Sequence, residues 1–159
     1  MKSFVFIKKL DFLKLIRYIP LVFLILLLSC ENDEQRRIPD VPVYLELDLT
    51  GRYSTFRNPY DTVVYERSQI VKDYVGFGGI LVNIGYDGNY YAYDLACPYE
   101  VNPSIRIYPD ESGIKAVCRS CGSEFEIWNG TGMVSKSPSK WNLKRYQTYV
   151  LDGILYVTR

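Results

Sequence analysis

The chain has 159 residues, of which 48% are hydrophobic and 15% aromatic, and its formal net charge is +1 at pH 7. This length suits one domain with a leader segment. Without residues 1–29 the chain carries 14 basic and 17 acidic residues, a net charge near −3 with no basic stripe, so nucleic acid is not an expected partner. The sequence contains no histidine, which excludes a Ser-His-Asp catalytic triad. No Gly-rich phosphate-binding loop precedes a predicted helix, so we expect a protein that is not an enzyme.

Residues 1–29 have the features of a secretory signal peptide. A basic region is followed by an apolar run, "IPLVFLILLLS" (Ile19–Ser29). This run is shorter than the roughly 20 apolar residues that a membrane-spanning helix needs, so a cleaved signal is the better interpretation. The run ends in "LLSC" (Leu27–Cys30), which resembles the lipobox of bacterial lipoproteins. The resemblance implies a lipid on Cys30 and a location in the bacterial cell envelope, anchored to the outer membrane or at the periplasmic face.

Residues 30–40 are predicted to be the lipidated cysteine and a tether, and residues 41–159 the folded domain. The charged stretch after Cys30, "ENDEQRR", is typical of a solvated linker. In Val41–Leu49, apolar residues alternate with mostly polar ones, which predicts a half-buried strand. A loop rich in Gly, Asn and Pro over residues 51–61 and a short strand over residues 62–67 follow.

Two β-hairpins are predicted in the rest of the chain. Asp87-Gly88 lies between apolar runs in residues 79–97, and Asp152-Gly153 does so in residues 145–159. The Asp-Gly pair favours the tight turn of a hairpin because glycine tolerates a positive φ. Residues 114–118 and 123–130 form a third pair of predicted strands. With no helical periodicity after residue 38 and 15 tyrosines, the sequence predicts an all-β domain.

Three cysteines remain once Cys30 is assigned to a lipid, and each follows a predicted strand and opens a loop. The second loop, "CRSC" followed by Gly122, places two thiols where both can turn toward one metal ion. The first loop, "CPYE", has the same spacing with a glutamate in place of the second thiol. Zinc accepts thiolate and carboxylate ligands in a tetrahedron, so the predicted metal ligands are Cys97, Glu100, Cys118 and Cys121.

The stretch "CRSCGSEF" (Cys118–Phe125) resembles the second cluster-binding loop of Rieske iron–sulfur domains. Upstream, "DGNYYAYDLACP" is similar to the hairpin that enters the first loop of this family, and "SKSPSKWNLKRY" (Ser135–Tyr146) to its proline-bearing covering loop. The resemblance spans residues 79–159. It implies an antiparallel β-sandwich with a small two-loop metal-site subdomain, in which Ser123 and Pro138 surround the ligands. From its residue type alone, Ser123 is also typical of a turn serine that bonds to its own backbone.

The ligands depart from this family, whose cluster binds two cysteines and two histidines. Tyr99 and Cys121 occupy the histidine positions, which resembles bacterial Rieske-like lipoproteins in which cysteines replace the histidines. Glu100 stands where their last cysteine lies. Three outcomes stay open: one zinc ion, a low-potential 2Fe–2S cluster, or no metal and a disulfide among Cys97, Cys118 and Cys121, as an oxidising compartment favours.

Two functions follow from these outcomes. The first is a lipid-anchored envelope protein with a degenerate Rieske-like metal-site domain, which acts in structure or binding without catalysis. The alternative is electron transfer through a modified 2Fe–2S cluster that serves an oxidoreductase partner.

Overall fold

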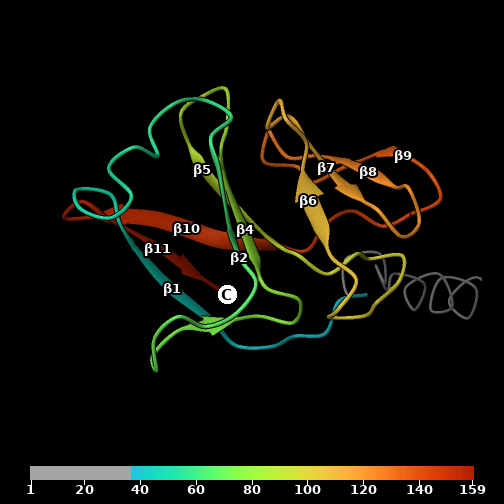
Figure 1. Ribbon diagram of the computed structural model, residues 1–159, viewed down its shortest axis with the longest axis horizontal. Coiled ribbons are helices and arrows are strands. Elements are labelled where there is room, and N and C mark those ends of the chain that lie inside the picture. The colour runs from blue at the N-terminus through green and yellow to red at the C-terminus, as the bar shows by residue number, and fades with distance from the viewer. Residues whose placement is uncertain (1–36) are drawn as a thin grey trace, which may run out of the picture. The chain divides into compact units, whose positions relative to one another are not determined.

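Eleven strands and no helix make up the secondary structure of residues 37–159, the part of the chain that the computed structural model describes (Figure 1). The predicted signal peptide and Cys30 lie outside these residues. None of the described residues belongs to a helix able to cross a membrane. The strands are β1 (Val43–Asp48), β2 (Thr62–Tyr65), β3 (Tyr74–Val75), β4 (Ile80–Ile84), β5 (Tyr90–Asp94), β6 (Ile107–Pro109), β7 (Lys115–Cys118), β8 (Glu124–Glu126), β9 (Val134–Lys136), β10 (Arg145–Leu151) and β11 (Ile154–Thr158).

Seven strands form a large antiparallel sheet in the order β2-β4-β5-β10-β11-β1-β3. Both predicted Asp-Gly hairpins are confirmed, since β4 pairs with β5 and β10 pairs with β11. In the second hairpin, Asp152 and Gly153 have φ values of 50° and 77°. Two consecutive positive φ values match the right-handed twist of the flanking strands.

Alternation along the strands builds the core of the large sheet. In β1 the side chains of Val43, Leu45 and Leu47 are buried, whereas those between them are partly exposed. The buried cluster also contains Phe56, Tyr65 and Leu155. Burial of one such side chain stabilises the fold by roughly 1.5–3 kcal/mol relative to exposure, so this core holds most of the large sheet together.

The four remaining strands form a small antiparallel sheet in the order β6-β7-β8-β9, drawn in orange beside the large sheet in Figure 1. In β8, Phe125 is fully buried while Glu124 and Glu126 face outward, as alternation predicts. Glu124 forms ion pairs with Lys115 and Lys136 on the two neighbouring strands. The all-β antiparallel class is therefore confirmed, with a second, smaller sheet that continues into the cysteine loops.

Three strands were not predicted: β3, β6 and β9. Each has only two or three residues, too few for an alternating pattern to emerge from the sequence. The end of the expected tether also differs from a solvated linker. Ile38 is only 3% exposed, and the ammonium group of Lys144 donates to the carbonyl oxygens of Ile38 and Pro39. Residues 37–40 therefore pack against the domain.

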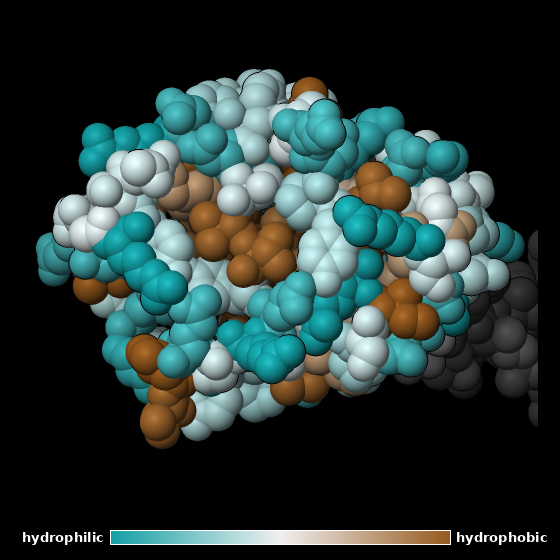
Figure 2. Space-filling view, in the orientation of Figure 1, coloured by the Kyte–Doolittle hydropathy of each residue, from teal (hydrophilic) through white to brown (hydrophobic). Residues whose placement is uncertain are grey.

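The outer surface mixes hydrophilic and apolar residues. Figure 2 shows a group of apolar residues in a hollow near the centre of one face, surrounded by hydrophilic ones. Elsewhere Ile70 and Val71 are exposed in the loop before β3, with Val71 fully accessible to solvent. Single exposed apolar residues are common on soluble domains and identify no site by themselves.

Candidate metal centre

Each cysteine loop begins where a strand ends. Cys97 lies three residues beyond the end of β5, and Cys118 is the last residue of β7. The N–H of Val101 donates to the carbonyl oxygen of Cys97 over 2.9 Å, and the N–H of Gly122 donates to that of Cys118 over 2.8 Å. Gly122 has a φ of 77°, a conformation that glycine adopts without strain. Both loops are therefore tight turns that close directly behind a thiol.

Strand β6 brings the two loops together. The N–H of Ile107 donates to the carbonyl oxygen of Leu95 over 2.8 Å, and the N–H of Cys97 donates to that of Ile105 over 3.0 Å. On its other side, β6 pairs with β7 and places Ile107 opposite Cys118. The short segment 105–107 thus lies between the two loops and positions both cysteines.

The three sulfur atoms meet in one small cluster, as the motif spacing predicts. The Sγ atoms of Cys97, Cys118 and Cys121 all lie within 4.8 Å of one another. The Sγ atoms of Cys97 and Cys121 are 3.7 Å apart, and no pair among the three forms a disulfide in the structure. Cys97 and Cys118 are fully buried, whereas Cys121 is partly exposed. The cluster therefore reaches the surface at Cys121.

Glu100 does not join this group of potential ligands, contrary to the expected four-residue set. Its carboxylate instead accepts a hydrogen bond from the hydroxyl of Ser120 over 3.2 Å. The physical reason is that the first turn folds back on Cys97 through its backbone, while the Glu100 side chain reaches across to the rim of the second loop. Tyr99, the residue at the first histidine position, is 40% exposed, and its backbone N–H donates to the sulfur of Cys97.

Ser123 links the cysteines to the proline-bearing loop. Its hydroxyl oxygen lies 3.2 Å from the Sγ of Cys121 and accepts the N–H of Ser139 over 2.9 Å. The thiol of Cys121 donates to this oxygen, whose two lone pairs accept both hydrogen bonds, and the hydroxyl hydrogen can turn to the sulfur when Cys121 is a thiolate. The hydrogen bonds of this hydroxyl run to Cys121 and Ser139, on either side of it. Pro138, which follows a cis peptide bond, directly precedes Ser139 in this loop.

The cysteines differ in acidity. Burial raises the pKa of Cys97 to about 12, although the backbone N–H groups of Glu100 and Tyr99 donate to its sulfur and lower it. Burial also acts against the thiolate of Cys121, but hydrogen bonds from the hydroxyl and N–H of Ser123, with those from the other two thiols, outweigh it and lower the pKa. Of these two thiols, Cys121 therefore ionises more easily.

The start of the described chain lies against the cysteine loops, a contact that the sequence does not signal. The guanidinium of Arg37 stacks on the ring of Trp141, with its carbon 3.6 Å from the ring centroid. The same group donates to the carbonyl oxygen of Tyr99 over 3.2 Å. Arg37 thus connects the first cysteine loop to the proline-bearing loop, and the cation–π contact stabilises the pair by about 0.5–2 kcal/mol.

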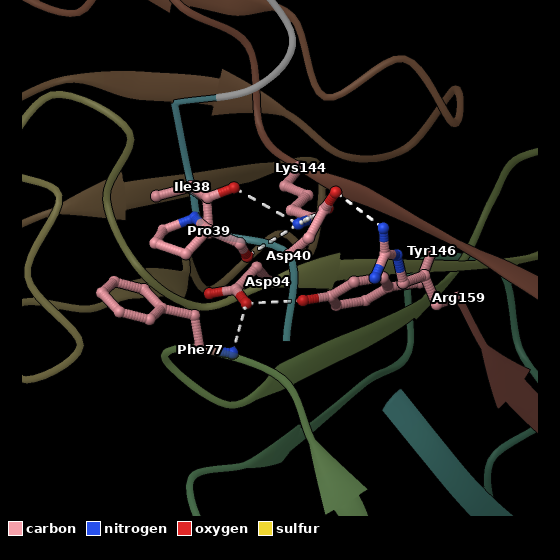
Figure 3. A network of polar contacts seen from close by, with 8 residues as sticks. All are labelled: Ile38, Pro39, Asp40, Phe77, Asp94, Lys144, Tyr146 and Arg159. Carbon is pink, nitrogen blue, oxygen red and sulfur yellow. Dashed lines mark hydrogen bonds and ion pairs between the residues drawn. The ribbon is translucent and has the colours of Figure 1, made fainter. Parts of the chain in front are cut away.

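A buried carboxylate supports the first loop from behind. Asp94 is fully buried and accepts the N–H groups of Phe77, Gly78 and Ala96 over 2.9, 3.0 and 2.7 Å. It also accepts the hydroxyl of Tyr146 over 2.6 Å, and burial together with this carboxylate raises the pKa of that phenol (Figure 3). Since Ala96 directly precedes Cys97, this network holds the loop at its first residue.

Figure 3 also shows a second group of contacts, which joins residues 38–40 to Lys144 and Arg159. The ammonium group of Lys144 lies 2.6 Å from a carboxylate oxygen of Asp40. The other oxygen of Asp40 lies 2.6 Å from the guanidinium of Arg159. The Asp40 carboxylate is largely exposed in both pairs, and ion pairs near the surface contribute at most about 1 kcal/mol each, so their main effect is to orient residues 38–40.

Comparison with known proteins gives a limited result. No family model matches this sequence, and no curated protein matches it. One similar solved chain comes from a "Complex of reduced oxygenase and oxidized ferredoxin in carbazole 1,9a-dioxygenase"; it is 18% identical, with a TM-score of 0.47 over 73% of this chain and 93% of that chain. A ferredoxin of Sphingomonas yanoikuyae B1 is 21% identical, with a TM-score of 0.43 over 62% and 84% of the two chains. At these values the likeness concerns the arrangement of strands alone.

Proposed function

We propose that this protein is a lipid-anchored protein of the bacterial cell envelope whose Rieske-like domain binds metal through Cys97, Cys118 and Cys121, in a binding or structural role without catalysis. The observation that supports the metal role is the meeting of three unbonded sulfurs within 4.8 Å, two of them in fully buried residues. Thiols converge in this way in metal centres, where the bound cation replaces their protons and ties separate loops together.

The standard Rieske cluster does not fit these residues. It requires two imidazole ligands on one iron, and the chain contains no histidine. Tyr99, at one of the two histidine positions, has no imidazole, and its side chain is 40% exposed. The metal of this proposal is therefore bound by thiolates, which favour zinc and other soft or borderline cations.

The lipid anchor rests on the signal-like leader and the lipobox-like sequence Leu27–Cys30. Arg37 follows Cys30 by seven positions. Seven extended residues span at most about 25 Å, so a lipid on Cys30 would hold the metal-binding domain close to the membrane surface.

Two measurements on the full chain expressed in a bacterium test the proposal. Mass spectrometry of the N-terminal peptide is expected to show Cys30 at the mature N-terminus with a diacylglyceryl group, and Cys30→Ala is expected to leave an unprocessed chain larger by the leader. Elemental analysis of the reduced protein is expected to show bound metal that is lost in Cys118→Ser. An unmodified, uncleaved wild-type chain would contradict the anchor, and a reduced wild-type chain that binds no metal would contradict the centre.

Electron transfer to a redox partner protein is the rival function, and the same preparation separates it from the proposal. An iron–sulfur centre absorbs visible light and releases acid-labile sulfide, whereas a zinc centre is colourless. Iron and sulfide in equal amounts, with a reversible one-electron reduction, would favour the rival.

A further inference from the structure

The distances between the sulfurs indicate how many metal ions they surround. With zinc–sulfur bonds of about 2.3 Å, tetrahedral geometry places two sulfurs on one ion about 3.8 Å apart. The Sγ atoms of Cys97 and Cys121 are 3.7 Å apart, and no pair within the cluster exceeds 4.8 Å. All three sulfurs can therefore bind the same ion with small adjustments of their side chains.

A two-iron cluster arranged as in Rieske domains requires a different pattern. Cys97 and Cys118 would bind one iron, and the residue at position 121 would bind the other. Ligands on different irons are separated by both metals and the sulfides that bridge them, so they lie farther apart than two ligands on one iron. In a two-iron cluster, the sulfurs of Cys97 and Cys121 would bind different irons and lie far apart. In this structure they are 3.7 Å apart, the distance expected for two ligands of a single ion.

Within the described residues 37–159, the structure brings three ligands to this ion and no fourth. Among residues 37–159, no other Cys, Asp or Glu belongs to the group, and histidine is absent from the whole chain. The carboxylate of Glu100 accepts a hydrogen bond from Ser120 instead. Cys97 and Cys118 are fully buried and Cys121 is partly exposed, so solvent approaches the three sulfurs at Cys121.

We propose that Cys97, Cys118 and Cys121 form a single-ion, three-thiolate site for a zinc-like divalent cation, with an exchangeable fourth coordination position open to solvent. This inference rests on the proposed metal-binding function and specifies it. Closed four-ligand zinc sites are structural, whereas sites with three protein ligands keep a position for water or another molecule. The open position takes a small thiol or imidazole donor, free or presented by another protein, so the site binds such donors through its metal.

Cobalt(II) is the probe for this site because it reports its ligands by colour. The full chain, reduced and stripped of metal, is titrated with cobalt while the visible spectrum is recorded. We expect one cobalt per chain, thiolate charge-transfer bands, and the strong ligand-field bands of a four-coordinate site. Added imidazole is expected to shift the ligand-field bands and leave the cobalt count unchanged, because it replaces water at the open position. A spectrum that imidazole does not alter would overturn the open position.

Substitutions then identify the ligands. Cys121→Ser is expected to weaken cobalt affinity by more than the roughly 10- to 100-fold that loss of an outer hydrogen-bonding group costs. Glu100→Gln is expected to keep the affinity, the spectrum and the response to imidazole, like the matched control Glu111→Gln, which alters an exposed glutamate in the loop before β7. A tenfold loss of affinity and an altered spectrum in Glu100→Gln alone would make Glu100 the fourth ligand and overturn the inference.

The remaining outcomes separate this inference from the proposed function. Two irons with acid-labile sulfide per chain in the isolated protein would overturn the single-ion site and preserve metal binding. Half a cobalt per chain would mean that a second copy completes the coordination, which also overturns the open position. A reduced wild-type chain that binds no cobalt, zinc or iron would overturn both proposals.

Discussion

The large sheet and the small sheet of this protein are built by different means. The core of the large sheet is aliphatic and aromatic, and its strands have up to seven residues. Strand β1 alternates between buried and more exposed positions, and β4 is buried throughout. The core of the small sheet includes Cys97 and Cys118 beside Phe125 and Ile127, and its strands have three or four residues. The cysteine loops thus join the region with fewer strand hydrogen bonds, where a bound metal would add the most order.

Phe125→Ala and Leu47→Ala test the difference between the two sheets with the largest expected effects. Both residues are fully buried, the first in the small sheet and the second in the large one. We expect the two substitutions to lower the free energy of unfolding by about 3–5 and 2–5 kcal/mol, because each leaves a cavity. Only Phe125→Ala is expected also to weaken metal binding, since Phe125 shares a buried cluster with two of the cysteines.

Chemical denaturation of the metal-free chain and metal titration of the folded protein measure the two effects separately. Equal losses of metal affinity in Phe125→Ala and Leu47→Ala would show that the two cores act as one, and would remove the distinction between the sheets.

Asp94→Asn tests the hydrogen-bond network that connects the end of β5, in the large sheet, to the first cysteine loop. Its buried carboxylate accepts three backbone N–H groups and the Tyr146 hydroxyl, and an amide nitrogen in its place turns one acceptor into a donor. Each buried donor left without an acceptor costs about 1–3 kcal/mol, so we expect a loss of stability of about 3 kcal/mol. Tyr146→Phe removes one of these hydrogen bonds and serves as the milder matched variant. Denaturation midpoints in the order wild type, Tyr146→Phe, Asp94→Asn are expected; an unchanged Asp94→Asn would contradict the supporting role of this residue.

Ser123→Ala sharpens the comparison at the centre itself. The hydroxyl contacts the sulfur of Cys121 and the N–H of Ser139, so its removal leaves both without that partner. Loss of such an outer hydrogen bond is expected to lower metal affinity by roughly 10- to 100-fold with a smaller change in fold stability. Competition with a chromophoric chelator measures the affinity. Ser135→Ala, an exposed serine in β9, is the control and is expected to bind like the wild type.

Thiol labelling gives the smallest expected effect. In the reduced, metal-free chain, we expect iodoacetamide to modify Cys121 at least roughly tenfold faster than Cys97, because the thiolate is the nucleophile and only Cys121 is partly exposed. The lowered pKa of Cys121 keeps its thiolate present to lower pH than in an ordinary cysteine, whereas the pKa of Cys97, about 12, keeps that thiol protonated through neutral pH. Peptide mapping between pH 6 and 9 is the measurement, and preferential labelling of Cys97 would contradict it.

Most of the large sheet follows from the sequence because its signals are local. Alternation in Val43–Asp48 and the Asp-Gly pairs at residues 87–88 and 152–153 predict β1 and two hairpins, and the structure contains all of them. The short strands β3, β6 and β9 carry no such pattern. Their conformation depends on neighbouring strands that supply hydrogen bonds, which no window of a few residues reveals.

The candidate site divides in the same way. The spacing of Cys118 and Cys121 and the position of Cys97 after a hairpin predict that the thiols meet, and they do. The sequence spacing also suggested Glu100 as a fourth ligand, but its side chain bonds to Ser120, a contact between two loops. No sequence motif indicates the roles of Asp94 and Arg37, because a buried hydrogen-bond acceptor and a cation stacked on a ring have no characteristic residue spacing.

By itself, the sequence determined the all-β class, the two hairpins and the identity of the thiols that meet, because residue alternation, turn chemistry and cysteine spacing are properties of short segments. Only the tertiary structure decided that β6 lies between the two cysteine loops, that Glu100 stays out of the cluster and that residues 37–40 pack on the domain. These features arise from contacts between distant parts of the chain, whose energies depend on the packing of the whole domain rather than on any one segment.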